Sequence, residues 1–262
     1  MYSSTELEEI DIEKCQSIRS SVSGSPAPIE RAMEIKVDPR KVAIAFLWVA
    51  AVLTVINSVL LFLSFYLGDD ELFGLLDFFD LDIEGNVPSL YSAVAVLFCS
   101  ALLALITHVN WHQSDGGRFY WLGLTIVFLF LAVDEGTAIH EQIGTFLERY
   151  MEAQGAFYFL WVVPYGVVTL VLGLAYSRFV WDLPKDTRLR FITAGIIFLV
   201  GALGVEMLGA REAELHGHYT VTYCILFTVE EMLEMLGIIL FIYALLRHLA
   251  AESGRISLVL ER

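Results

Sequence analysis

Residues 220–248 read TVTYCILFTVEEMLEMLGIILFIYALLRH, an apolar stretch that carries Glu230, Glu231 and Glu234. A helix needs about 20 mostly apolar residues to cross the hydrocarbon core of a bilayer, so this stretch is long enough. An ionised side chain such as Asp costs about 2.5 to 3.5 kcal/mol at the centre of a membrane helix. The stretch therefore predicts a membrane helix whose carboxylates have a compensating partner.

The rest of the chain repeats this apolar pattern. The chain is 57% hydrophobic, with a mean hydropathy of +0.66, which exceeds the apolar content of an ordinary soluble domain. The runs expected to span a membrane are residues 41–67, 89–110, 119–149, 156–180, 190–210 and 220–248. The predicted fold class is all-α, a polytopic membrane helix bundle with about six transmembrane helices. The predicted parts are a disordered cytoplasmic tail at 1–40, a six-helix transmembrane domain at 41–250 and a cytoplasmic C-terminal tail at 251–262.

The distribution of basic residues predicts the orientation. With six spans, 14 of the 16 Lys and Arg residues fall on the side that holds both chain ends, and only Arg149 and Arg211 fall on the other side. Basic residues concentrate in cytoplasmic segments, so both termini are expected in the cytoplasm. The acidic turn Glu84-Gly85-Asn86, between the first two spans, is then expected to face outward.

Acidic residues also interrupt the third and fifth spans. Asp134 lies roughly 22 Å inside the third span at the helical rise, and Glu206 is about as deep in the fifth. Glu234 lies roughly 21 Å from the cytoplasmic end of the sixth span. Three helices thus bring carboxylates to one level in the outer half of the bilayer, which indicates a functional polar site.

The expected site holds far more acidic than basic groups. Arg211 balances about one carboxylate, so protons or a bound cation must neutralise the others. Carboxylates clustered with histidine are typical ligands of divalent metal ions, and a divalent metal ion of unknown identity is the expected cofactor. The predicted ligands are His140, Glu141, Glu206, Glu230 and Glu234. Asp134 or Glu135 is predicted to act as a general base or as a partner of these ligands. The remaining predicted members of the polar site are Glu84, Asn86, Arg211 and Glu231.

Four segments together resemble a family of bacterial multipass membrane proteins that has no established activity. The segments are DIEGNVPSLYS (82–92), VDEGTAIHE (133–141), GALGVE (201–206) and EEMLEMLG (230–237). The likeness covers most of the chain after the N-terminal tail. It implies a multipass protein of the bacterial inner membrane, and it implies no chemistry.

A fainter similarity is to alkaline ceramidase-like membrane hydrolases, which combine an acidic Glu-x-Asn turn, an early Ser, an Asp in a middle helix and zinc-binding His residues. The positions that fit this pattern are Glu84, Asn86, Ser92 and Asp134. The last helix departs from it, because Glu230 and Glu234 stand where that superfamily has paired His. The departure affects the zinc ligands themselves.

Three classes of function remain open at this point. The first is a metal-dependent membrane hydrolase or oxidoreductase whose substrate, a lipid or a quinone, enters from the side. The second is a transporter that loads and releases a cation or protons on the same carboxylates. The third is a structural membrane subunit with protonated carboxylates. Membrane lipids are expected partners in every case and nucleic acid is not, while the oligomeric state is not indicated.

Overall fold

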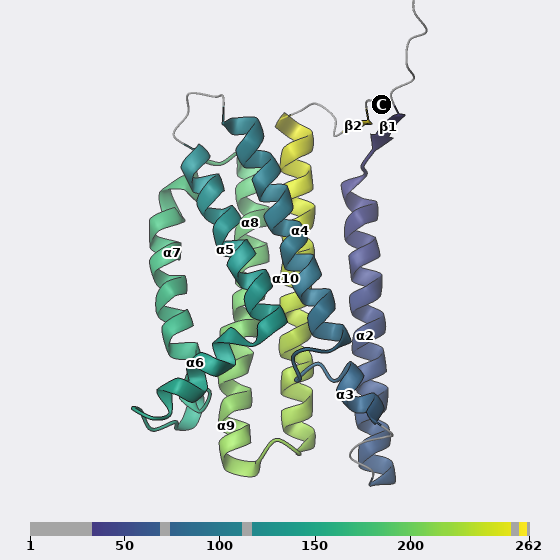
Figure 1. The fold of residues 1–262 in the computed structure, drawn as a ribbon, viewed down its shortest axis with the longest axis vertical. Helices are drawn as coiled ribbons and strands as arrows, with labels where there is room; N and C mark the ends of the chain where they lie inside the picture. The colour runs from purple at the N-terminus through teal and green to yellow at the C-terminus, as the bar shows by residue number, and fades with distance from the viewer. Residues whose placement is uncertain (1–32, 69–73, 112–116, 253–256, 261–262) are drawn as a thin grey trace, which may run out of the picture. The chain divides into compact units, whose positions relative to one another are not determined.

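The computed structural model describes residues 33–68, 74–111, 117–252 and 257–260. Its long elements are helices that run roughly side by side (Figure 1). The predicted all-α class is therefore confirmed.

Two short strands form a unit separate from the helices. Strand β1 (Met33–Lys36) pairs antiparallel with β2 (Ser257–Leu260), and Met33 lies opposite Leu260. Both strands fall within the tails predicted at 1–40 and 251–262. Of those tails, residues 1–32, 253–256 and 261–262 lie outside the described residues.

Within the part of the chain that the structure describes, five helical segments are long and apolar enough to cross a membrane. They are α2 (Pro39–Leu67), α4 (Val87–Asn110), α5 (Arg118–Thr137), α7 (Val162–Asp182) and the run Lys185–His216. The chain is thus a multipass membrane protein. The sixth predicted span corresponds to α10 (Val221–Glu252), a helix of 32 residues, and its crossing of the membrane stays a prediction.

The third predicted span, residues 119–149, is not one helix. Helix α5 ends at Thr137, Ala138 adopts a left-handed backbone with a φ of 54°, and a separate helix α6 (Ile139–Leu147) follows at an angle (Figure 1). The expectation of a single span over residues 119–149 was wrong, because the chain breaks within the polar stretch DEGTAIHEQ (134–142). Alanine is the best helix former, so Ala138 itself does not mark the position of the break.

The fifth predicted span, residues 190–210, is a continuous helical run with an irregular centre. It consists of α8 (Lys185–Leu199), a π-helical segment η3 (Val200–Val205) and α9 (Glu206–His216). Such π turns occur frequently at functional sites. Here the π turn ends directly before Glu206.

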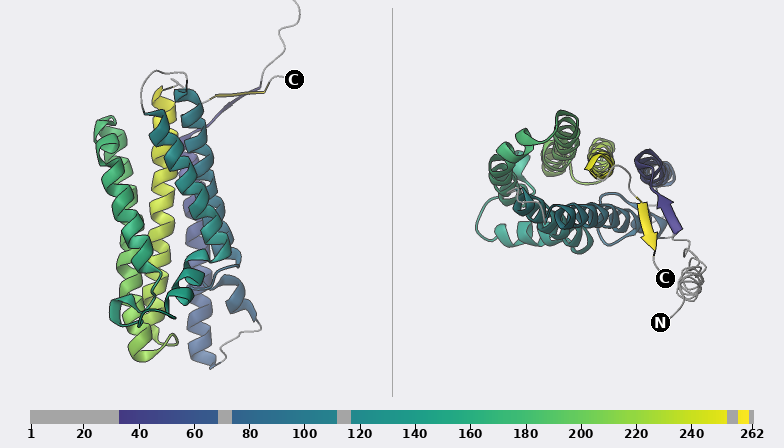
Figure 2. Two further views of the ribbon diagram at one scale, coloured as in Figure 1. Left: turned by 60° about the vertical axis from the view of Figure 1, so that its left-hand side comes forward. Right: turned by 90° about the horizontal axis from the view of Figure 1, so that it is seen from above.

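The core lies where α4, α5, α8 and α10 pack together. Leu103 and Ile106 of α4 and Ile242 and Leu245 of α10 are each 0% exposed. Viewed from above, α10 lies between α8 and α2 (Figure 2). This packing fixes α10, with its glutamates, against the π-helical segment.

The acidic loop before α4 is anchored from two sides. Helix α3 (Leu75–Phe79) precedes it. The buried side chain of Asn57, on α2, accepts a hydrogen bond from the Leu81 N–H at 3.3 Å and donates one to Thr228 Oγ1 of α10 at 3.2 Å. At the other end, Asn86 and Ser89 form a reciprocal capping box at the start of α4. The loop that carries Glu84 is therefore held in place from both ends.

Candidate functional site

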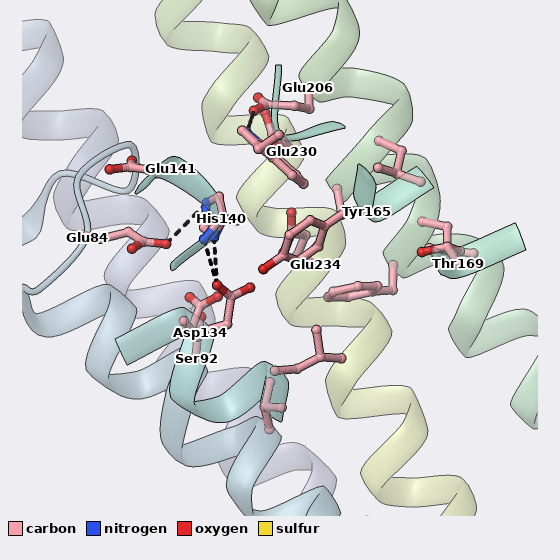
Figure 3. Close-up of a pocket in the computed structure, with 18 of the residues that line it drawn as sticks. Glu84, Ser92, Asp134, His140, Glu141, Tyr165, Thr169, Glu206, Glu230 and Glu234 are labelled. Carbon is pink, nitrogen blue, oxygen red and sulfur yellow. Dashed lines mark hydrogen bonds and ion pairs between the residues drawn. The ribbon is translucent and has the colours of Figure 1, made fainter. Parts of the chain in front are cut away.

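A cavity of about 1110 Å³ collects most of the predicted site residues (Figure 3). Those on its wall are Glu84, Asp134, Glu135, His140, Glu141, Glu206, Glu230, Glu231 and Glu234. They come from the loop before α4 and from α5, α6, α9 and α10. Among the described residues, no Lys or Arg lines this cavity. The acidic groups of separate helices therefore share one space without a permanent positive charge on its wall.

Two predicted members lie elsewhere. Asn86 caps α4, since its Oδ1 accepts from the Ser89 N–H at 3.2 Å and its Nδ2 donates to the Asp80 carbonyl at 2.6 Å. Arg211 is exposed on α9 and makes no ion pair with any residue that the structure describes. Asn86 thus shapes the loop, and Arg211 does not balance a carboxylate of the cavity as the sequence suggested.

The carboxylate of Asp134 connects α5 to α6. Its Oδ1 accepts a hydrogen bond from the His140 backbone N–H at 2.8 Å, and its carbonyl accepts one from the Ala138 N–H at 2.8 Å. The first N–H groups of a helix lack partners within the helix, so a carboxylate there is favourable. In one continuous helix, Asp134 and His140 lie about 120° apart around the axis. The break at Ala138 brings them together.

The imidazole of His140 lies between two carboxylates, as Figure 3 shows. Its Nδ1 is 3.4 Å from Asp134 Oδ1, and its Nε2 is 3.4 Å from Glu84 Oε1. The Trp161 ring lies 4.7 Å from the imidazole centroid to centroid and packs edge-on against it. The orientation of the imidazole is thus fixed by a carboxylate near each ring nitrogen and by the Trp161 ring packed against it.

Glu84 and His140, which lie outside the membrane-spanning helices, have shifted pKa values. Burial raises the pKa of Glu84 from 4.5 to about 8, and the negative charges of Glu135 and Glu141 add to this while His140 opposes it. Burial alone lowers the pKa of His140, but the hydrogen bond with Asp134 and the charge of Glu84 outweigh it and raise this pKa. Both groups therefore hold their protons to a higher pH than they do in water.

One group of side chains has the spacing of a metal site. Oxygen or nitrogen atoms of Glu84, His140 and Glu141 all lie within 4.8 Å of one another. Glu84 was predicted as a neighbouring polar residue, and the structure places it among the candidate ligands instead. Among the described residues, the other predicted ligands, Glu206, Glu230 and Glu234, do not belong to this group.

Glu206 and Glu230 form a second acidic pair on the same cavity. Glu206 Oε1 accepts a hydrogen bond from the Trp161 indole N–H at 3.0 Å, and its side chain also hydrogen-bonds that of Glu230. The close approach of the two helices depends on Gly201, because a Cβ there would lie 2.8 Å from the Glu230 carbonyl oxygen. Trp161 contacts both this pair and His140, so it links the two acidic groups.

Three further glutamates complete the acidic wall. Glu135 follows Asp134 on α5, and Glu231 and Glu234 follow Glu230 on α10. All three are partly buried. They extend the acidic wall of the cavity beyond the candidate ligands.

Sequence reasoning missed several residues that position the site. Trp161, Tyr165 and Asn57 carry no charge and lie in or beside apolar runs, where aromatic residues are common for reasons of lipid contact. Tyr165 lies on the cavity wall, and its ring packs against those of His140 and Trp161. The one available signal was a polar side chain, Asn57, inside the first span, where an unpaired amide is unfavourable.

The comparisons with known proteins give a family and no activity. No curated protein and no solved structure matches the chain, so the similarity to alkaline ceramidase-like hydrolases gains no support from them. A family model described as a domain of unknown function (DUF8692) matches residues 42–249, which include every residue that lines the cavity. The chain therefore belongs to the DUF8692 family of uncharacterised domains.

Proposed function

We propose that this protein is a membrane enzyme that binds a divalent metal ion through Glu84, His140 and Glu141 and hydrolyses a lipid. The observation that carries the proposal is the Asp134–His140–Glu84 arrangement beside Glu141. Metal-binding histidines usually donate their second ring N–H to a carboxylate, which fixes the tautomer and orients the ring. Asp134 Oδ1 stands at 3.4 Å from Nδ1 in that role, while Nε2 faces Glu84.

The residues present fit an ion at this position. Glu84 Oε2 is buried and has no hydrogen-bond partner among the described residues. A buried carboxylate oxygen without a partner is costly, and a cation bound there satisfies it. One imidazole and two carboxylates suit zinc, manganese or ferrous iron, and three protein ligands leave coordination positions open.

The surrounding side chains supply the other requirements of hydrolysis. A bound divalent ion lowers the pKa of a water molecule and polarises a carbonyl group. Asp134 keeps the His140 Nδ1 proton in place, so Nε2 keeps its lone pair for binding. Glu135 lines the cavity beside Asp134 and is the candidate proton acceptor, while Trp161 and Tyr165 exclude water from one side.

Elemental analysis of detergent-purified protein tests the proposal. We expect about one equivalent of metal per chain in the wild type, as three ligands predict for one site, and its loss in His140→Ala and Glu84→Gln. Glu148→Gln is the matched control, because Glu148 lines the same cavity but does not belong to the ligand group. Metal-free wild-type protein, or metal retained in both ligand variants, contradicts the proposal.

A cation- or proton-coupled transporter is the second candidate. It is favoured by the hydrogen-bonded carboxyl groups of Glu206 and Glu230 next to the π turn Val200–Val205. Two carboxyl groups that share a hydrogen bond hold a proton between them, and polar groups of this kind mark ion pathways in membrane bundles. Proton uptake into liposomes that is lost in Glu206→Gln, with metal content unchanged, supports this candidate over the enzyme.

The proposed location is the bacterial inner membrane, with both termini in the cytoplasm. The support is the concentration of 14 of the 16 Lys and Arg residues on one side of six predicted spans. In that orientation the Glu84 loop and His140 face the outer side. Accessibility of a single cysteine introduced at Glu148, compared with one introduced at Arg178, tests it in intact cells.

A further inference from the structure

The cavity extends well beyond its acidic end. Its other walls are apolar and come from three helices: Val127 and Leu131 of α5, Leu172 of α7, and Phe198 and Leu199 of α8. All three helices are among the segments apolar enough to cross a membrane. The medium next to this part of the cavity is therefore lipid hydrocarbon.

Aromatic contacts define the two ends of the apolar part. At one end, Tyr120 of α5 contacts Tyr176 and Phe179 of α7, with ring centroids 5.5 and 4.9 Å apart. At the other end, His140 contacts the Tyr165 ring of α7, with centroids 6.1 Å apart. From Tyr165 to Tyr176 the helix rises about 17 Å, close to half of a hydrocarbon core of about 30 Å. This is the length that the acyl chains of one leaflet fill.

The side of the cavity between α5 and α7 is not sealed. Ile126 and Phe130 of α5 and Val168 of α7 line the cavity, yet they remain 60%, 46% and 57% exposed. Glycines widen the space further, since a Cβ on Gly173 or Gly195 would meet no atom within 4 Å. A lipid chain can therefore enter between α5 and α7, and the space beside Gly173 and Gly195 accommodates it.

The charge of the polar end restricts the head group. Ten carboxyl side chains line the cavity and, within the described ranges, no Lys or Arg does. The wall therefore offers no basic side chain to pair with a phosphate head group, and each carboxylate that is ionised repels one. We propose that the cavity holds a single-chain lipid with an uncharged or cationic head group. Its chain lies between α5, α7 and α8, and its head lies against the acidic wall. This rests on the proposed function, which places the reactive end at Glu84, His140 and Glu141.

Photolabelling of the full chain in membranes tests the inference. The probe is hexadecylamine with a photoreactive diazirine in its chain, and hexadecyl phosphate with the same diazirine is the comparison. We expect the amine to label the α5, α7 and α8 residues of the cavity wall, and the phosphate to label them far less. Equal labelling by both probes, or labelling spread over the outer faces of the bundle, overturns the inference.

Three glycine variants make the test specific. Gly173→Leu and Gly195→Leu fill the cavity and are expected to lower amine labelling at least tenfold, since excluding about two methylene groups already weakens binding by roughly this factor. Gly166→Leu is the matched control, because Gly166 lies on α7 with equally open space but not on the cavity wall. Unchanged labelling in the two filling variants overturns the inference.

Metal content, measured on the same preparations, separates this inference from the proposed function. Retained metal in Gly173→Leu shows that its fold is intact, so a loss of labelling there reports on the cavity alone. Metal-free wild-type protein that is still labelled in the expected pattern removes the metal proposal and leaves the lipid site standing.

Discussion

The Asp134 carboxylate accepts a hydrogen bond from the His140 backbone N–H at 2.8 Å and lies 3.4 Å from the Nδ1 atom of the same residue. One side chain therefore both starts helix α6 and orients the imidazole. These two effects can be separated by substitution.

Asp134→Asn keeps an oxygen that accepts the His140 N–H but removes the charge facing Nδ1. We expect the helix to remain intact and the metal affinity to fall about 10- to 100-fold, the usual effect of losing a carboxylate partner of a ligand histidine. Asp134→Ala also removes the cap and is expected to lower the free energy of unfolding by about 1 kcal/mol more. Competition with a chromophoric chelator and thermal unfolding in detergent measure the two effects. An Asn variant with unchanged affinity contradicts the orienting role.

Metal binding is expected to weaken as the pH falls below about 8, because burial raises the pKa of Glu84 to about 8 and a protonated carboxyl group does not bind metal. The slope is expected to approach a tenfold loss in affinity per pH unit for each proton displaced. Titration of the wild type with metal at several pH values checks this, and the Glu84→Asp variant, which keeps a carboxylate at this position, is expected to keep the dependence.

The metal-free protein is expected to show the opposite trend in stability. Because the pKa of Glu84 is higher in the folded protein than its ordinary value of 4.5, the folded state binds the proton more tightly than the unfolded state. This contribution to the free energy of unfolding is complete below pH 4.5 and is lost as the pH rises through about 8. Chemical unfolding of Glu84→Gln, compared with the wild type in chelator, is expected to show a weaker decline between those pH values.

Gly201→Ala is expected to lower the free energy of unfolding by about 1 to 3 kcal/mol, as overpacking does. The added methyl group meets the Glu230 carbonyl oxygen at 2.8 Å and the Leu233 Cβ at 3.1 Å, so η3 must move away from α10. Gly204→Ala is the control on the same π turn, where the nearest atom is Val200 Cγ1 at 3.9 Å. Equal stability of the two variants in thermal unfolding contradicts the close approach.

Trp161→Phe keeps an aromatic ring beside His140 but removes the indole N–H that binds Glu206 Oε1 at 3.0 Å. The expected cost is about 1 kcal/mol, because a part-buried acceptor loses its donor. Trp181→Phe, at a tryptophan of α7 that is 69% exposed, is the matched control. Equilibrium unfolding in mixed micelles compares them, and a Trp161→Phe variant as stable as this control argues against the Glu206 contact.

Two features of the site could not be read from the chain. The acidic residues of α5, α9 and α10 were identifiable, because a carboxylate inside an apolar run stands out against its neighbours. The position of the break was not, since alanine is a strong helix former and the left-handed conformation of Ala138 is held by the hydrogen bond from its N–H to the Asp134 carbonyl. Glu84 was expected as a neighbouring polar residue, and only the anchoring of its loop by Asn57 and Asn86 brings it to His140.

The sequence by itself determined the helical class and the presence of acidic groups within the apolar runs, because length and hydropathy report directly on what a bilayer accepts. Tertiary structure decided which of these groups meet. The Asp134 cap, the π turn before Glu206 and the glycine contact at Gly201 each depend on atoms from distant segments, and no local pattern of residues encodes a distance between two helices.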